Sequence, residues 1–327
     1  MFTQYRPKNR VRRLLAIGPV LVLGTLVMHA GRHHGGLGVF GQPARPVQAV
    51  DPAVFSKGSC IAYAPTTGDR HLTVFLDAGH GGLDPGSVGT TESGRTIYEA
   101  NETLPVELDA TALLRNAGFR VVVSRTRDSS VARLRPADVV GKLLTSQGVH
   151  DDVAARDICA NDAHANVLVG IYFDAGAPGN AGSVTGYDGV RPFAADNLRL
   201  AHLVQNDVLT TMNARGWGIP NEGVQPDTEL GSAIGSQALA YGHLLLLGPA
   251  QRGYFTTPSR MPGTLIEPLF ITDPFEGSIA ASPTGQHVIA AGLAHAIEQY
   301  FARPARPRTV TVLTARASSK DERRGQG

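Results

Sequence analysis

The sequence predicts an α/β fold, with a mixed or mostly parallel central sheet and helices on both faces. Short apolar runs rich in β-branched residues alternate with longer segments in which apolar residues recur every three or four positions, and this alternation is typical of α/β proteins. The chain has 327 residues and is 42% hydrophobic, which is enough to bury one good core. The expected strands lie at residues 72–76, 119–124, 167–173, 243–247 and 264–266.

The first 30 residues are typical of a targeting segment. Arg10, Arg12 and Arg13 precede a nearly uncharged apolar run at residues 14–28, which is the order found in signal peptides. The run is short for a membrane-spanning helix and no good cleavage site follows it, so a cleaved signal peptide and an uncleaved signal-anchor both stay open. Either one predicts an exported chain, and the second adds a possible membrane tether.

The rest of the chain divides by composition. Residues 31–70 are rich in glycine, proline and alanine and predict a flexible linker, so the globular domain is expected over residues 71–302. Residues 303–327 carry seven lysines and arginines against two acids, which predicts a basic disordered tail. Inside the domain, residues 218–242 are rich in glycine and polar residues and predict a long surface connection.

The first expected strand ends in the sequence DAGHGG, which places His80 among glycines. Gly79, Gly81 and Gly82 leave few side chains around the imidazole, so another group can approach it closely. The alternative on this stretch alone is a loop histidine without a function.

Three helices are expected where apolar residues share one helical face, at residues 106–117, 198–209 and 288–297. We interpret these faces as core and not as cofactor-binding surfaces. Pro105 predicts that the first of these helices starts near residue 103 or 104, because proline is tolerated only in the first turn of a helix. Glu99 would then lie in a looser turn before the helix.

Charge and cysteine content bear on partners and compartment. The formal net charge of +2 gives no global attraction to nucleic acid, and no basic patch with interleaved aromatic residues is visible, so no nucleic-acid partner is expected. The two cysteines are Cys60 and Cys159. In an exported protein they can form one disulfide, but two buried free thiols stay equally open.

His80 and Glu99 can supply two of the three protein ligands that a catalytic zinc ion needs. Several stretches resemble the zinc-dependent N-acetylmuramoyl-L-alanine amidases of bacterial cell walls, the family often called amidase type 3. They are DAGHGGLDPGSVG, GRTIYEANETL, GFRVVVSRTRD, AARDICANDAHANVLVGIYFDAG and MPGTLIEPLFITDPFE. The resemblance covers roughly residues 72–301, and several motifs in the right order are more specific than any one of them.

The resemblance implies that His80 and Glu99 are the first two zinc ligands and that Glu267 is the catalytic carboxylate. The family's third ligand is a histidine at the end of the third strand, and Tyr172 stands at that position. A neutral phenol is a poor zinc ligand, because its pKa near 10 must fall before the oxygen carries charge. Asp174 is the alternative third ligand, since residues two apart on a strand point to the same side.

By this resemblance the chain is a peptidoglycan hydrolase that cleaves the amide between N-acetylmuramic acid and L-alanine with zinc-activated water. Its substrate would be a muropeptide, met outside the cell, in the cell wall or at a membrane surface facing the envelope. The alternative function is a catalytically inactive amidase-like domain that binds cell-wall peptide or regulates a hydrolase. Glu267 favours the enzyme, whereas the missing histidine at Tyr172 favours the binding domain.

Overall fold

The computed structural model describes residues 48–49, 54–177, 179–230 and 236–302, and all of them belong to one compact unit, Ala44–Gly327. The predicted targeting segment and the predicted basic tail lie outside the described residues. Among the helices of the described part, none has both the length and the apolar character needed to cross a membrane.

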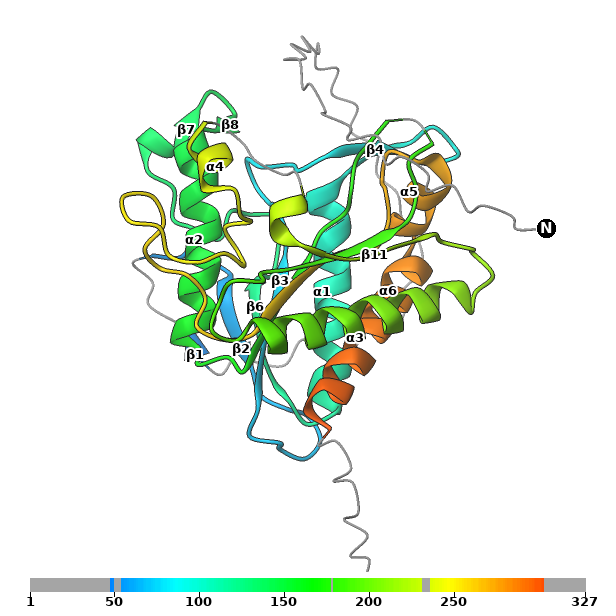
Figure 1. Cartoon of the computed structure of the whole chain (residues 1–327). Helices are drawn as coiled ribbons and strands as arrows, with labels where there is room; N and C mark the ends of the chain where they lie inside the picture. Colours follow the sequence, from blue (N-terminus) through cyan, green and yellow to red (C-terminus); the bar gives the residue numbers. More distant parts are fainter. Residues whose placement is uncertain (1–47, 50–53, 178, 231–235, 303–327) are drawn as a thin grey trace, which may run out of the picture. The chain divides into compact units, whose positions relative to one another are not determined.

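An eight-stranded mixed sheet lies at the centre of this unit (Figure 1). In order across the sheet, the strands are β1 (Gln48–Ala49), β2 (Ser59–Tyr63), β6 (Arg120–Arg125), β3 (Thr73–Ala78), β9 (Val167–Ile171), β12 (Gly263–Glu267), β10 (Ser183–Tyr187) and β11 (Asn221–Pro226). The four middle strands, β6, β3, β9 and β12, are parallel. Strands β2 and β10 flank them in antiparallel pairing, and β11 runs parallel to β10. This confirms the predicted α/β class with a mixed central sheet.

Helices cover both faces of the sheet, as predicted. One face packs against α1 (Glu99–Asn116), α3 (Ala194–Asn213) and α6 (Pro283–Phe301). The other face packs against α2 (Ser146–Asp162), which Figure 1 shows on the opposite side of the strands. Because both faces of the parallel strands are buried, these strands appear in the sequence as continuous apolar runs.

The shorter elements lie around the sheet ends. They are the hairpins β4 (Val88–Thr90) with β5 (Thr96–Tyr98) and β7 (Val139–Val140) with β8 (Leu143–Leu144), the helices α4 (Ser236–Tyr241) and α5 (Pro274–Ala280), and the 3-10 turns η1 (Pro136–Asp138) and η2 (Asp227–Glu229).

Helix α1 begins at Glu99, so the predicted start near residue 103 is wrong and Pro105 lies inside the helix. Tertiary contacts hold the first turn in place of the backbone hydrogen bond that proline cannot donate. The guanidinium of Arg125 donates to the carbonyl oxygen of Ala100 at 2.6 Å and to the hydroxyl of Thr103 at 3.0 Å. Glu99 therefore lies on a regular helix that is anchored to the sheet.

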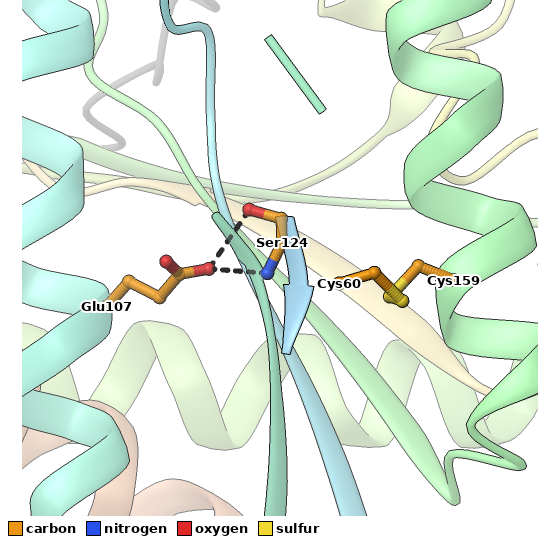
Figure 2. Close-up of a disulfide and its surroundings, with 4 residues drawn as sticks. All are labelled: Cys60, Glu107, Ser124 and Cys159. Atoms are coloured by element: carbon orange, nitrogen blue, oxygen red, sulfur yellow. Dashed lines mark hydrogen bonds between the residues drawn. A yellow bond between two sulfur atoms is a disulfide. The ribbon is translucent and has the colours of Figure 1, made fainter. Parts of the chain in front are cut away.

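Strand β2 belongs to the central sheet although it precedes residue 71, where the sequence predicts the domain to start. Cys60 of β2 and Cys159 of α2 are both fully buried and form a disulfide with 5.6 Å between their Cα atoms (Figure 2). Of the two alternatives for the cysteines, the structure has the disulfide. Linking residues 99 positions apart stabilises the fold by roughly 4.7 kcal/mol in the chain-entropy model for a loop of about 100 residues.

Two other expectations are corrected. Residues 243–247 form a bend and turns, not a strand. They are apolar because Leu246 and Leu247 are buried against the α2 side of the sheet, and a short apolar run does not distinguish a strand from a buried turn. Strand β11 lies within the predicted surface connection at 218–242. It pairs with β10 alone and has no buried residue, so it lacks the apolar alternation that marks a strand.

Candidate functional site

The carboxyl ends of β3, β9 and β12 meet at one edge of the sheet, because these three strands are parallel neighbours. His80 follows β3, Tyr172 follows β9 and Glu267 is the last residue of β12. Glu99, the first residue of α1, reaches the same edge. Ligand sites of open α/β sheets lie outside the carboxyl ends of strands. The topology therefore brings together predicted site residues from distant parts of the chain.

His80 and Glu99 face each other across this edge. The Nε2 atom of His80 lies 3.1 Å from Oε1 of Glu99, and its Nδ1 atom lies 2.8 Å from Oδ2 of Asp84. Glu99 is buried, and its oxygens also accept hydrogen bonds from the backbone N–H groups of Phe173 and Ser87, each at 2.9 Å. Both ring nitrogens of His80 thus have a carboxylate neighbour.

These neighbours favour a positive charge on His80. Burial opposes that charge, but the carboxylates of Glu99 and Asp84 outweigh burial and raise the pKa of His80 to about 10. Burial also disfavours a charged Glu99, yet the nearby His80 lowers the pKa of Glu99 below its usual value. Glu99 is therefore an ionised carboxylate at neutral pH.

The glycine-rich loop allows this close packing, as its sequence predicts. His80 has a positive φ of 59°. A Cβ atom at Gly86 would lie 2.7 Å from both Oε2 of Glu99 and Cδ2 of His80, so a larger residue there would displace the pair. A Cβ atom at Gly79 would lie 2.5 Å from the ring of Tyr172. Glycine is needed at both positions.

Tyr172 stands, by the sequence resemblance, at the position of the family's third zinc ligand, and in the structure its hydroxyl contacts an aspartate of β3. It donates to Oδ2 of Asp77 at 3.1 Å, while the other oxygen of Asp77 pairs with Arg156. The Tyr172 ring meets the His80 ring edge-on, with 5.3 Å between centroids. Burial and the charge of Asp77 raise the pKa of Tyr172 well above 10, so the group is a neutral phenol. This geometry does not support Tyr172 as a metal ligand.

Glu267 and Asp174 add two carboxyl groups to the site. Burial raises the pKa of Glu267 well above its usual value, and the charges of Asp174 and Glu99 raise it further. Burial likewise raises the pKa of Asp174, with a further contribution from Glu99. The site therefore gathers more carboxyl groups than the single imidazole of His80 can neutralise, as expected of a site that binds a cation.

The donors of His80 and Glu99 fit a zinc ion. Zinc bonds of about 2.0–2.2 Å place two ligand atoms of a tetrahedral site roughly 3.3 Å apart, close to the 3.1 Å between His80 Nε2 and Glu99 Oε1. The structure gives less direct support for a third zinc ligand. Within the described part of the chain, one trio of potential ligand residues has all its ligand atoms within 4.8 Å of one another, and it does not include these two. The role of Asp174 as third ligand stays a prediction.

Two buried arginines hold the loop that carries His80, and the sequence interpretation missed both. Arg156 of α2 donates to the carbonyl oxygen of His80 at 2.9 Å and pairs with Asp77. Arg125 of β6 donates to the carbonyl oxygen of Gly79 at 3.1 Å. A signal was present in the sequence, since Arg125 ends a strand whose middle is the apolar run Val121–Val123, where a charged residue must find a buried partner.

Comparisons with known proteins identify the chain's relatives. The family model described as N-acetylmuramoyl-L-alanine amidase (Amidase_3) matches residues 74–299. The chain is similar to the N-acetylmuramoyl-L-alanine amidase AmiA of Salmonella typhimurium, with 25% identity over 255 residues, covering 75% of this chain and 81% of AmiA. It is also similar to the uncharacterised protein YqiI of Bacillus subtilis, with 24% identity over 230 residues, covering 70% of this chain and 84% of YqiI.

The fold has a solved counterpart. The CwlD amidase of Clostridioides difficile, solved in complex with the GerS lipoprotein, aligns with a TM-score of 0.52 and 22% identity. The alignment covers 70% of this chain and 98% of CwlD. At this level of identity the likeness concerns the fold, and it agrees with the mixed α/β sheet described above.

Proposed function

This chain belongs to the N-acetylmuramoyl-L-alanine amidase family, and we propose that it is a peptidoglycan hydrolase that cleaves the amide between N-acetylmuramic acid and L-alanine. The main support for this proposal is that His80, Glu99 and Glu267 lie together at the carboxyl ends of the parallel strands. All three lie within the matched region, residues 74–299. The sequence similarity to AmiA, which is named as an amidase of this class, supports the same reaction.

The proposal includes zinc as the metal of this site, held by His80, Glu99 and Asp174. The 3.1 Å separation of the His80 and Glu99 donors supports the first two ligands. Asp174 supports the third: burial raises its pKa to about 6, and the charge of Glu99 contributes to the rise, so the two carboxyl groups lie near each other. Zinc, when bound, supplies an activated water molecule and polarises the scissile carbonyl group.

Glu267 acts as the general base and then as the general acid. Its carboxylate takes a proton from the attacking water and passes it to the amide nitrogen of the leaving L-alanine. The burial that raises the pKa of Glu267 makes its carboxylate a stronger base than an exposed glutamate. Asp84, bound to Nδ1 of His80, fixes the orientation of the imidazole so that Nε2 faces Glu99.

A catalytically inactive, peptide-binding domain is the second candidate function. The observation that favours it is Tyr172, whose phenol is neutral and bound to Asp77. The match to the amidase family and the similarity to AmiA favour the enzyme.

The proposal also places the protein outside the cytoplasm, where peptidoglycan lies. The Cys60–Cys159 disulfide supports this location, because disulfides persist in oxidising compartments. The charged and apolar order of residues 1–30 supports it independently. That segment would serve either as a cleaved signal peptide or as an anchor that tethers the domain to the membrane.

The test measures zinc per mole of protein and cleavage of purified muropeptides for the wild type, Asp174→Ala and Tyr172→His. We expect the wild type to contain zinc and to be active. Asp174→Ala should lose the zinc ion of this site and, with it, the activity. Asp109→Ala is the matched control, because Asp109 lies on α1 but pairs with His287 and not with a residue of the proposed zinc site.

The outcomes separate the hypotheses. A wild type without activity that gains zinc and cleavage through Tyr172→His would reject the enzyme in favour of the inactive domain. An active wild type that is insensitive to Asp174→Ala would reject Asp174 as a ligand and leave the amidase function intact.

A further inference from the structure

A second group of potential metal-ligand residues lies at the end of the sheet opposite to that of His80 and Glu99, where the antiparallel strand β10 ends. Strands β10 and β11 are parallel and pair Tyr187 with Pro226, so the residues that follow them, Asp188 and Asp227, lie side by side. His243, just after α4, completes the group. We call these three residues the Asp-Asp-His cluster.

The atoms of the cluster converge on one point. The Nδ1 atom of His243 lies 3.2 Å from Oδ2 of Asp188 and 3.1 Å from Oδ2 of Asp227. One ligand atom from each residue lies within 4.8 Å of the other two. Both aspartates are buried, while the His243 side chain is 18% exposed, so solvent reaches the cluster from the side of the imidazole.

One oxygen of the cluster lacks a hydrogen-bond partner among the described residues. Oδ1 of Asp188 accepts from the backbone N–H groups of Val190 and Arg191, at 2.9 and 2.8 Å. Oδ2 is fully buried and makes no hydrogen bond, although the His243 ring lies within 3.2 Å of it. A buried carboxylate oxygen without a partner is costly unless a cation compensates it.

The nearest arginine along the chain does not supply that cation. The guanidinium of Arg191 donates to the backbone carbonyl oxygens of Leu247, Gly248 and Ser259. Within the described part of the chain, the ion pairs of Asp188 and Asp227 both go to His243, so two carboxylates are faced by one imidazole. The cluster has the composition of a site for a doubly charged cation.

We propose that Asp188, Asp227 and His243 bind a divalent first-row metal ion, with Zn²⁺ as the preferred occupant. Two carboxylate oxygens and an imidazole nitrogen are ligands that zinc accepts, and the imidazole disfavours Ca²⁺ and Mg²⁺, which prefer oxygen ligands. Three protein ligands leave the fourth position to water on the exposed side of His243.

This site is separate from that of His80 and Glu99. Strand β10 is antiparallel to β12 and pairs Val184 with Glu267. Asp188 lies four residues beyond Val184, which places it about 13 Å farther along the strand direction, at roughly 3.3 Å per residue. A metal ion here would not touch the scissile amide. It would tie the ends of β10 and β11 to the segment that follows α4.

The test counts Zn²⁺ per mole in the purified chain after dialysis against limiting zinc, for the wild type, Asp188→Asn, His243→Ala and His80→Ala. Asp188→Asn keeps the Oδ1 acceptor for Val190 and Arg191 while removing the charge, so it preserves the local turn. His295→Ala is the matched control, because His295 is an exposed histidine whose ion pair, among the described residues, is with the single carboxylate of Asp207.

We expect Asp188→Asn and His243→Ala each to lose one zinc equivalent relative to the wild type and to His295→Ala. A chelator should lower the melting temperature of the wild type by more than that of Asp188→Asn, because the variant has only the amidase-site metal to lose. Equal zinc content in the wild type and both cluster variants would overturn the proposal and leave the cluster a buried ion pair. His80→Ala should change the zinc content of the amidase site alone. The zinc content of this variant therefore tests the amidase site, and that of the cluster variants tests the Asp-Asp-His cluster, so either proposal can fail without the other.

Discussion

Replacing Glu107 with glutamine should stabilise the folded chain at pH 8 and have a much smaller effect at pH 4. Glu107 lies on α1 and is fully buried. One carboxyl oxygen accepts hydrogen bonds from the N–H and the hydroxyl of Ser124, each at 3.0 Å (Figure 2), and from the N–H of Ala78 at 3.0 Å. The other oxygen is buried without a hydrogen-bond partner among the described residues.

The expected magnitude follows from the pKa of this group. Burial raises the pKa of Glu107 from 4.5 to about 7, although the charge of Arg125 opposes the rise. Because each pH unit corresponds to about 1.4 kcal/mol, ionisation of Glu107 at high pH costs the folded state roughly 3 kcal/mol. The folded state binds the proton more tightly than the unfolded state. The stabilisation is therefore fully present below pH 4.5 and is lost as the pH rises through about 7.

Glutamine has nearly the shape of protonated glutamate and does not titrate, so Glu107→Gln should keep the stability that the wild type loses. The assay is urea denaturation of both chains at a series of pH values from 4 to 8, with the disulfide intact. The difference in free energy of unfolding should grow by roughly 3 kcal/mol in favour of the variant across this range. Glu298→Gln is the control, since Glu298 is a half-exposed surface residue paired with Arg70. A difference that does not change with pH would refute the reasoning.

Two other variants test the catalytic base and the disulfide. Glu267→Gln should reduce muropeptide cleavage by about 10²-fold or more without changing the zinc content, because it removes proton transfer and no metal ligand; loss of zinc would show that Glu267 is itself a ligand. Replacing Cys60 and Cys159 with alanine should lower the free energy of unfolding by about 4–5 kcal/mol in urea denaturation. An unchanged denaturation midpoint would contradict the role of this disulfide in stability.

The parallel strands and long helices of the fold could be predicted because the pattern of apolar residues along the sequence reflects which of their faces are buried. Strands such as β3 and β9 are covered on both faces and therefore form apolar runs, while α1, α3 and α6 present one apolar face. Strand β11 could not be found this way, because it lies at an edge and buries no residue. Strand β2 was missed since its five residues follow a linker-like composition, and its burial depends on Cys159 and β6.

The candidate site was predictable to the extent that it depends on residue type and strand order. The motif places His80 after β3, and parallel pairing then brings Glu267 to the same edge. Asp84 was within reach of the same reasoning, as a carboxylate in the same glycine-rich loop as the histidine. The Asp-Asp-His cluster could not be predicted from the sequence. The apolar run at 243–247 predicts a strand at His243, and the pairing of β10 with β11 has no sequence signal.

The contacts of Tyr172 show how a tyrosine at this position is held by its surroundings. The phenol joins the Asp77–Arg156 ion pair, and Arg156 also holds the carbonyl oxygen of His80. Tyr172 therefore contributes to the orientation of His80 through a hydrogen-bond chain across β3, β9 and α2. A histidine at this position is too short to make the same contact from the same backbone. The tyrosine is thus a buried support of the loop that carries His80. On the proposed function, Asp174 then supplies the third metal ligand and Glu267 stays the catalytic base. Burial raises the pKa of both carboxyl groups, and the nearby charge of Glu99 raises both further.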